Sequence, residues 1–352
     1  MTTSGGKIRI GFLGGGFIAH HHGKMLHIGS VPHEITAVHD PDGEKAESFA
    51  AASGARVVST EAELFDDVDA IYVCTWTSEH RRLVEEAARR RLPVFCEKPL
   101  AFDAAEAAAM VEAVEEAGVI NQVGLVLRDS PSFNLLRAMV SDPTAGRVMS
   151  VMFRDDQYIP IQGQYASTWR ADVERAGAGT LLEHSIHDLD ILEWLFGEVH
   201  EVTARSSEFH AISGIEDVVM AQIGFVSGAF GALTSVWHDV MARPSGRRME
   251  VLCERAFLVL EGDVWGPVRR ITDGDGEEVF ENTDLVAELG RRGGGFRNPD
   301  EAFLVAVRDG TPASPTFADA LRPHVLADAI YRSCRLGGHR IAVASGRPPV
   351  PV

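Results

Sequence analysis

Residues 177–190, GAGTLLEHSIHDLD, gather side chains that could serve as acids, bases or ligands. Glu183 and His187 are four residues apart, so on a helix they would share one face. A carboxylate beside an imidazole favours the charged ring and fixes its orientation, which suits a general base. Thr180 and Glu183 also have the spacing of a capping box, so Glu183 could instead close the start of the helix. The sequence leaves both roles of Glu183 open.

The same stretch raises the question of a metal site. His184 and His187 are three residues apart, whereas the zinc-binding motif on a helix places its histidines four apart. We therefore expect no metal ion, although two histidines and nearby carboxylates could suit one. We expect His184 to line a pocket or an interface, and Asp190 to fix a neighbouring loop rather than react.

A second group of residues with chemical meaning is the glycine-rich turn FLGGGFIA, which ends a strand pattern and opens a helix pattern. The spacing is that of a dinucleotide-binding turn with alanine at its third position. The first glycine permits the tight turn, and the second lets backbone N–H groups approach a pyrophosphate. A tight turn without a ligand is the alternative. The residues expected to contact the cofactor here are Gly14, Gly15, Gly16, Phe17 and Ile18.

An acidic residue stands at the end of the next strand pattern. HEITAVHD ends in Asp40, about 20 residues beyond the turn, where a carboxylate can accept hydrogen bonds from ribose hydroxyls. The same carboxylate would repel a 2′-phosphate, so we expect NAD as the cofactor rather than NADP. Asp40 also begins the turn DPDG, a position that suits aspartate for local reasons. Both roles can hold together.

Three consecutive histidines, His20, His21 and His22, follow the glycine turn. On a helix they point about 100° apart and cannot converge on one metal ion. We expect most of them to lie on the surface or in helix packing.

The elements that must position these residues alternate between strand and helix over the first 125 residues. This alternation with short turns predicts an α/β fold with a doubly wound parallel sheet, which binds ligands at the carboxyl ends of its strands. The expected strands are 7–14, 33–40, 69–75, 92–99 and 119–127, and the expected helices are 17–29, 43–54, 78–91 and 104–118.

The pattern changes from about residue 126. Helices are expected at 131–142, from the 177–190 stretch to 197, and near the end of the chain. The strands joined by short glycine-containing turns favour antiparallel pairing, so this part reads as α+β with one large sheet. Its expected strands are 146–159, 198–209, 216–228, 229–239, 247–262 and 267–273. We therefore expect a nucleotide-binding domain over 1–125 and a second domain over 126–352.

The composition excludes several classes of partner. A net charge of −18 repels phosphate backbones, so nucleic acid is not expected as a partner. No run approaches the roughly 18–20 apolar residues of a membrane helix, and the first residues lack a signal-peptide pattern. Isolated cysteines indicate no disulfide framework and favour the reducing cytoplasm. These cysteines are at 74, 96, 253 and 334.

The motifs together resemble the Gfo/Idh/MocA oxidoreductases, in order along essentially the whole chain. The resemblance rests on LGGGFIA, CTWTSEH, VFCEKPLA and GAGTLLEHSIHDLD. It implies an N-terminal NAD(P)-binding Rossmann domain and a C-terminal domain with a large, open, mostly antiparallel sheet. That sheet implies a homodimer or homotetramer, and the final helix, about 317–336, is expected to pack back on the first domain.

The resemblance also implies roles for individual residues. Those implied as catalytic are Lys98, His187 and Glu183. Those implied on the cofactor side are Thr75, Trp76, His80, Glu97 and Lys98. Those implied on the substrate side are Lys98, Arg128, Trp169, Arg170, Asp172, His184 and His187. The chain departs from the family twice, because most members carry proline at Trp76 and many carry aspartate at Glu183.

The function implied is hydride transfer between a nicotinamide cofactor and a hydroxyl or keto carbon of a sugar, cyclitol or related polyol. Either His187 or Lys98 would carry the proton, and the cofactor supplies the hydride chemistry. Two alternatives remain at this point: a redox-neutral lyase or glycosidase that retains NAD and passes through a keto sugar, or a non-catalytic protein that senses NAD or a sugar. NAD that co-purifies without net NADH formation would indicate the first of these.

Overall fold

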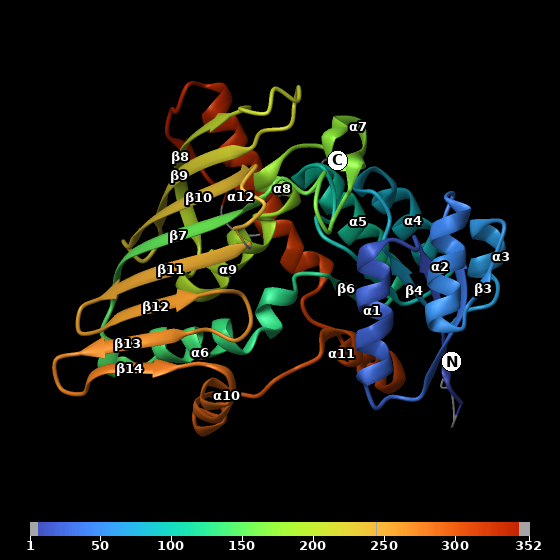
Figure 1. The fold of residues 1–352 in the computed structure, drawn as a ribbon, viewed down its shortest axis with the longest axis horizontal. Helices are drawn as coiled ribbons and strands as arrows, with labels where there is room; N and C mark the ends of the chain where they lie inside the picture. The colour runs from blue at the N-terminus through green and yellow to red at the C-terminus, as the bar shows by residue number, and fades with distance from the viewer. Residues whose placement is uncertain (1–5, 244, 345–352) are drawn as a thin grey trace. The chain divides into compact units, whose positions relative to one another are not determined.

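The computed structural model describes residues 6–243 and 245–344, and these divide into two compact units (Figure 1). The first contains the described residues up to Leu125 together with Arg297–Leu321. The second contains those of Val126–Phe296 together with the described residues from Arg322 onward. The first unit is therefore not continuous in sequence, and the division falls inside the helix Phe317–Arg335, α12.

The first unit is built on a six-stranded sheet in which every neighbouring pair is parallel. The strand order β3-β2-β1-β4-β5-β6 reverses direction between β1 and β4, as in dinucleotide-binding folds. The doubly wound parallel sheet expected from the sequence is confirmed. Its strands are β1 (Ile8–Leu13), β2 (His33–His39), β3 (Arg56–Val57), β4 (Ala70–Val73), β5 (Val94–Cys96) and β6 (Asn121–Val123).

Local signals begin and end the helices of this unit. Asp42 accepts hydrogen bonds from the first backbone N–H groups of α2, and Gly54 ends that helix with a φ of 82°. Asp103 caps α5 in the same way, and Gly118 ends it with a φ of 64°. The helices are α1 (Phe17–Ile28), α2 (Gly43–Ser53), α3 (Glu61–Phe65), α4 (Thr77–Arg89), α5 (Ala104–Ala117) and α11 (Pro299–Asp309).

The core of this unit contains a row of stacked rings from three neighbouring strands. The rings of Phe12 and Tyr72 are 4.7 Å apart, and those of Tyr72 and Phe95 are 4.8 Å apart. Phe49 of α2 and Phe303 of α11 join the same fully buried cluster. Each buried ring of this size contributes about 1.5–3 kcal/mol of transfer free energy. The returning segment with α11 is thus an integral part of the core.

Several hydrogen bonds attach that returning segment to the parallel sheet and its helices. The side-chain amide of Asn298 donates to the Met25 carbonyl at 2.8 Å. At the β6 edge, the Val123 N–H donates to the carbonyl of Pro315 at 3.0 Å, and the Phe317 N–H donates to the side chain of Asn121 at 2.9 Å. The exposed edge of β6 is covered in this way.

The second unit contains a nine-stranded sheet of order β14-β13-β12-β11-β7-β10-β9-β8-β15 (Figure 1). All neighbours are antiparallel except β7 and β10, which confirms the expected, mostly antiparallel sheet. The segment 247–262, expected as one strand, forms two. The strands are β7 (Val148–Tyr158), β8 (Val199–Ser207), β9 (Val218–Phe225), β10 (Phe230–His238), β11 (Gly246–Cys253), β12 (Phe257–Glu261), β13 (Val268–Thr272), β14 (Gly276–Phe280) and β15 (Ile341–Ala342).

Helices lie against one face of this sheet, and the strands alternate accordingly. Val151 and Leu233 point to the helical face and are buried, whereas Met152 and Phe230 point to the opposite face and are exposed. Besides α12, the helical segments are η1 (Val126–Asp129), α6 (Pro131–Val140), η2 (Pro143–Ala145), η3 (Thr168–Ala171), α7 (Val173–Ala176), α8 (Thr180–Glu183), α9 (Ile186–Phe196) and α10 (Asn282–Arg291). Among the described residues, no helix is both long and apolar enough to cross a membrane.

Candidate functional site

The glycine turn of the first unit has the conformation that its sequence predicts. Gly14 adopts a φ of 94°, and a side chain there would overlap the Cys74 carbonyl oxygen. The Gly14 N–H donates to the carbonyl of His39 at 2.8 Å, which ties the turn to the end of β2. Ala19, at the third position of the motif, is fully buried against the strands. The glycine and alanine positions are thus both accounted for by close packing.

The start of α1 has room for an anion. Gly16 is the N-cap residue and provides no side-chain hydrogen bond to the first turn. A Cβ atom built on Gly16 would meet no other atom within 4 Å, so open space lies in front of the turn. Phe17 is exposed at the beginning of the helix, and Ile18 is half-buried. The arrangement fits a pyrophosphate, which helix N-termini bind through backbone N–H groups.

Asp40 follows β2 and is oriented by two backbone N–H groups. Its Oδ2 accepts from Gly15 at 2.8 Å, and its Oδ1 accepts from Asp42 at 2.8 Å. A carboxylate has about four acceptor positions, so capacity remains for ribose hydroxyls. The two roles anticipated for Asp40, turn residue and ribose acceptor, are therefore compatible.

His80 connects the loops that follow β4 and β5. Its Nδ1 lies 2.9 Å from the Pro99 carbonyl oxygen, and its Nε2 lies 3.4 Å from that of Thr75. Burial lowers the pKa of His80, so the ring is neutral and its N–H donates to the closer carbonyl of Pro99. The Thr75 hydroxyl donates to the Trp76 carbonyl at 3.3 Å, and Trp76 caps α4. The structure therefore gives His80 a bracing role in shaping both loops.

The Glu-Lys-Pro motif follows β5 directly, at the carboxyl end of the sheet. Lys98 is half-buried there and precedes a cis proline, Pro99. Glu97 is buried and pairs with His22 of α1, a contact that the sequence did not reveal. Of the three histidines expected on the surface or in helix packing, His21 is exposed, but His22 is a buried charged partner of the motif.

In the second unit, the stretch 177–190 is not one continuous helix, so this expectation was wrong. Helix α8 ends at Glu183 and α9 begins at Ile186. The Ser185 hydroxyl at the break donates to Asp155 on β7 at 2.9 Å, and its oxygen accepts from the hydroxyl of Ser235 on β10 at 2.6 Å. The helix is thus interrupted at a residue whose side chain is hydrogen-bonded to two strands of the sheet.

The capping box, one of the two roles left open for Glu183, is also absent from α8. Gly179 is the N-cap residue, and the Thr180 hydroxyl pairs with Ser235 at 2.8 Å. Glu183 instead forms an ion pair with Arg170 of η3, with Nε and Oε1 2.6 Å apart. The Arg170 guanidinium lies over the ring of Trp169, 4.6 Å from its centroid. Trp169, Arg170 and Glu183 thus form a connected group.

The actual cap of α8 is a residue that sequence reasoning missed. The buried Glu216 carboxylate accepts from the backbone N–H groups of Gly179 at 2.8 Å and Leu181 at 3.0 Å. It also accepts from the hydroxyl of Tyr331 at 2.9 Å. Burial raises the pKa of Glu216, although these hydrogen bonds oppose the rise. A side chain at Gly179 would overlap the Glu216 backbone, so glycine at this position allows the two segments to pack closely.

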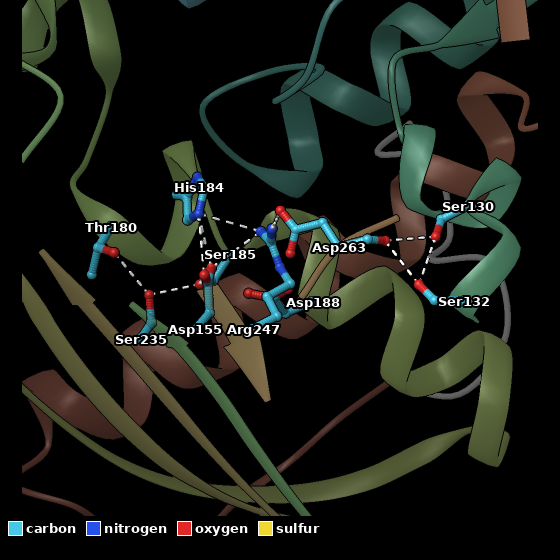
Figure 2. A network of polar contacts seen from close by, with 10 residues as sticks. All are labelled: Ser130, Ser132, Asp155, Thr180, His184, Ser185, Asp188, Ser235, Arg247 and Asp263. Atoms are coloured by element: carbon cyan, nitrogen blue, oxygen red, sulfur yellow. Dashed lines mark hydrogen bonds and ion pairs between the residues drawn. The ribbon is translucent and has the colours of Figure 1, made fainter. Parts of the chain in front are cut away.

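Polar residues on three adjacent strands form a buried network beneath α8 and α9 (Figure 2). Asp155 on β7 is the direct neighbour of Ser235 on β10 and of Arg247 on β11. Arg247 donates to Asp155 at 3.2 Å and to Asp188 of α9 at 2.6 Å. His184 Nε2 lies 3.1 Å from Asp155. The sheet thus holds His184 and the start of α9 through charged contacts.

The carboxyl group of Asp188 is unusual within this network. Burial and the neighbouring Asp155 carboxylate raise the pKa of Asp188 well above its ordinary value, although Arg247 opposes the rise. A raised pKa favours the protonated form of Asp188 in the folded protein.

Two further candidate residues have structural partners. Arg128 donates twice to Asp190, from Nε at 2.8 Å and from Nη2 at 2.6 Å, so Asp190 fixes η1 as expected. Asp172 accepts from the Glu174 N–H at 3.0 Å and thereby caps α7.

His187 lies in the first turn of α9 and is buried. Among the described residues, no group of three or more His, Cys, Asp or Glu could hold a metal ion.

Comparison with known proteins identifies the family. Residues 8–125 match the model described as "Oxidoreductase family, NAD-binding Rossmann fold", and residues 133–259 match the "GFO/IDH/MocA C-terminal domain". The chain belongs to the Gfo/Idh/MocA family. This member is an NAD-binding oxidoreductase, as the glycine turn and Asp40 indicate.

Several curated Gfo/Idh/MocA relatives align along most of the chain. The myo-inositol 2-dehydrogenase of Thermotoga maritima is 30% identical over 280 residues, covering 77% of this chain and 79% of that one. The inositol 2-dehydrogenase of Rhizobium meliloti is 27% identical over 342 residues, covering 93% and 96%. Levoglucosan dehydrogenase, solved in complex with NADH and levoglucosan, has a TM-score of 0.83 at 20% identity and covers 96% of this chain and all of that one. This last likeness supports the fold.

Proposed function

We propose that this chain is an NAD-dependent dehydrogenase that transfers hydride between the nicotinamide and a hydroxyl or keto carbon of a cyclitol, sugar or related polyol. The observation that carries the proposal is the alignment with inositol dehydrogenases across both domains. A scyllo-inositol 2-dehydrogenase of Bacillus subtilis, 31% identical over 255 residues, gives the same direction. The comparisons favour neither a redox-neutral lyase nor a sensing protein.

The residues of the first unit would hold the cofactor at the carboxyl ends of β1, β2 and β4. The N–H groups around Gly15 and Gly16 suit the pyrophosphate, and Asp40 suits the adenosine ribose. Thr75 and Trp76 would border the nicotinamide side, with His80 holding their loop. When bound, the nicotinamide accepts or provides the hydride.

The proton of the reacting hydroxyl group would pass to a side chain of this protein. His187 is our proposed general base, because it is buried in the first turn of α9 and its imidazole could accept the hydroxyl proton as the hydride leaves. Lys98 would donate a hydrogen bond to the same oxygen and stabilise the negative charge that develops on it. Glu183, through its ion pair with Arg170, would order the chain beside His187.

The remaining proposed substrate-side residues would form the wall of the site. Asp190 holds Arg128 in one orientation, and Asp155 holds His184. The set that we propose to contact a polyol comprises Arg128, Trp169, Arg170, Asp172 and His184, together with Lys98 and His187. Hydroxyl-rich ligands suit such walls because each hydroxyl group can both donate and accept.

The test is NADH formation from NAD with a panel of cyclitols and sugars, followed by near-ultraviolet absorbance. We expect turnover with at least one cyclitol or sugar, and a loss of about 100- to 10,000-fold in kcat for His187→Ala and for Lys98→Ala. Matched controls are exposed residues of the same types, His200→Ala and Lys24→Ala. NAD binding without turnover on any alcohol or carbonyl partner would overturn the proposal.

We also propose that two or more copies associate through the open face of the nine-stranded sheet. Phe230 and Met220 are 65% and 59% exposed on the adjacent strands β10 and β9, and Met152 is exposed on β7. Apolar side chains gathered on one face indicate an interaction surface. Phe230→Glu should lower the mass in light scattering, and an unchanged mass would argue against this surface.

The isolated cysteines are consistent with a cytoplasmic site of action.

A further inference from the structure

A buried ionic group joins three distant segments of the first unit. His22 of α1 contacts Glu97 of the Glu-Lys-Pro motif, with Nε2 and Oε1 2.9 Å apart. It also contacts Asp300 of α11, with Nδ1 and Oδ1 2.7 Å apart. We call these three residues the His22 cluster. Its members are 1%, 7% and 1% exposed, respectively, so water is excluded from it.

Both ring nitrogens of His22 face carboxylates, which determines the charge of the ring. A carboxylate oxygen accepts hydrogen bonds, so both nitrogens must carry hydrogen and the ring is an imidazolium. Burial lowers the pKa of His22, but Asp300 and Glu97 together raise it to about 10. Burial likewise raises the pKa of Glu97, but His22 outweighs this and holds the value below its ordinary one. His22 and Glu97 are therefore both charged at neutral pH.

Rigid neighbours surround the cluster. The His22 ring lies 4.8 Å from the ring of Phe95 and 5.6 Å from that of Tyr72, both in the aromatic core. Gly124 follows β6, and any side chain there would overlap the Glu97 carboxylate. The carboxylate is thus confined on one side by backbone and on the other by the imidazolium.

The second oxygen of Glu97 connects the cluster to Lys98. Glu97 Oε2 accepts from the backbone N–H of Lys98 at 3.2 Å, and the Glu97 N–H donates to the Val73 carbonyl at 3.0 Å. The carboxylate therefore links the imidazolium with the main chain that carries Lys98. The contact between the imidazolium and the Glu97 carboxylate, at 2.9 Å, is a charge-assisted hydrogen bond and is about twice as strong as a neutral one.

We propose that His22 is a positioning residue, whose imidazolium sets the location of Lys98 by orienting Glu97. The catalytic consequence rests on the proposed function, in which Lys98 contacts the reacting oxygen. Asp300 completes the device, because it provides the second carboxylate that keeps the ring charged and turned toward Glu97. Asp300, near the end of the chain, thereby influences the Glu-Lys-Pro motif in the first third of the sequence.

Attachment of α11 alone does not require this charge. Asn298 and Glu301 also fasten α11 to the region at the end of α1, the first through the Met25 carbonyl and the second through the Ser30 N–H at 2.8 Å. Glu301→Ala should therefore loosen α11 without touching His22. It is the control that separates helix attachment from the positioning of Lys98.

The experiment uses the small number of lysines, which are Lys7, Lys24, Lys45 and Lys98. Reductive methylation with ¹³C-formaldehyde gives one dimethylamine resonance for each, beside that of the α-amino group, and Lys98→Arg assigns the one of interest. The full-length proteins compared are wild type, His22→Gln, Asp300→Asn, Glu301→Ala and, as an exposed control on α1, His27→Gln. This measurement requires neither substrate nor turnover.

We expect the Lys98 resonance alone to shift or broaden in His22→Gln and, to a smaller extent, in Asp300→Asn. Glu301→Ala and His27→Gln should leave it unchanged. Asp300→Asn keeps an acceptor oxygen and serves if His22→Gln does not fold. A Lys98 resonance that matches wild type in the folded cluster variants, even with a lowered Tm, would overturn the proposal and leave the cluster a purely structural role.

Kinetics with any substrate that wild type turns over provide the second measurement. His22→Gln should lower kcat about 10- to 100-fold, as expected for a displaced catalytic group, while KM for NAD changes little. The primary deuterium isotope effect should rise because hydride transfer becomes slower relative to product release. If wild type turns over no substrate, the proposed function fails, and the Lys98 resonance still decides the role of His22.

Discussion

Replacing Asp188 by asparagine is expected to stabilise the protein increasingly as pH rises. The Asp188 carboxyl is fully buried between Arg247 and the Asp155 carboxylate, and burial raises its pKa well above the ordinary value. The folded protein therefore keeps a proton that the unfolded chain has released. Asparagine is neutral at every pH, has nearly the same shape, and its oxygen can still accept from Arg247.

The sign and size of the effect follow from proton binding. An unfolded aspartate titrates near pH 3.9, so above this value, and up to the raised folded-state pKa, the folded form of the wild type holds the extra proton. The free energy of unfolding of the wild type then falls by up to about 1.4 kcal/mol per pH unit relative to the variant. Over each pH unit in that range, the difference should grow by up to about 1.4 kcal/mol, or roughly 3–6 °C in Tm for a unit of this size.

The assay is thermal unfolding of wild type and Asp188→Asn at pH 5, 6 and 7. The matched control is Asp155→Asn, which removes the carboxylate that faces both Arg247 and His184. Loss of one partner of a buried ion pair costs about 3–5 kcal/mol, so this control should be destabilised throughout. If Asp188→Asn is destabilised as much as the control, or if its difference from wild type does not grow with pH, Asp188 is ionised and our reasoning is wrong.

Two further predictions concern the turns that carry the site. Asp40→Ala should raise KM for NAD about 10- to 100-fold, because a charged hydrogen-bond acceptor contributes about 1.5–3 kcal/mol. The change in kcat should be smaller. Steady-state kinetics would contradict the ribose assignment if both constants changed equally. Gly179→Ala should lower Tm strongly, because its methyl group would overlap a backbone carbonyl. The control Gly290→Ala, in open space on α10, should leave Tm unchanged or slightly higher. Equal Tm values for the two variants would refute this prediction.

The sequence was most informative where a local pattern determines a local structure. The glycine turn, the parallel strands and the position of Lys98 follow from short-range rules, and the structure has them where expected. The break at His184–Ser185 did not follow, because it depends on Asp155 and Ser235 of the sheet. A helical spacing argument assumes a continuous helix and does not detect a break at a residue whose side chain is hydrogen-bonded to distant strands.

The partners of the candidate residues were the part of the site that the sequence predicted least well. Asp300 lies 278 positions from His22, and Glu216 lies 37 positions from the Gly179 N–H that it caps. No spacing rule connects such pairs, because only the folded chain brings them together. Glu183 illustrates the result, since two local roles were weighed and its observed partner, Arg170, was not among them.

The return of Arg297–Leu321 to the first unit sets an order of events during synthesis. The strands up to Val123 emerge from the ribosome long before Asp300, which follows eight of the nine strands of the second sheet. At about 5–20 residues per second, the intervening chain takes roughly 10–35 s to make. Throughout that interval, the edge of β6 is uncovered and His22 has only one of its two carboxylates. The nucleotide-binding half of the molecule is thus begun first and completed almost last.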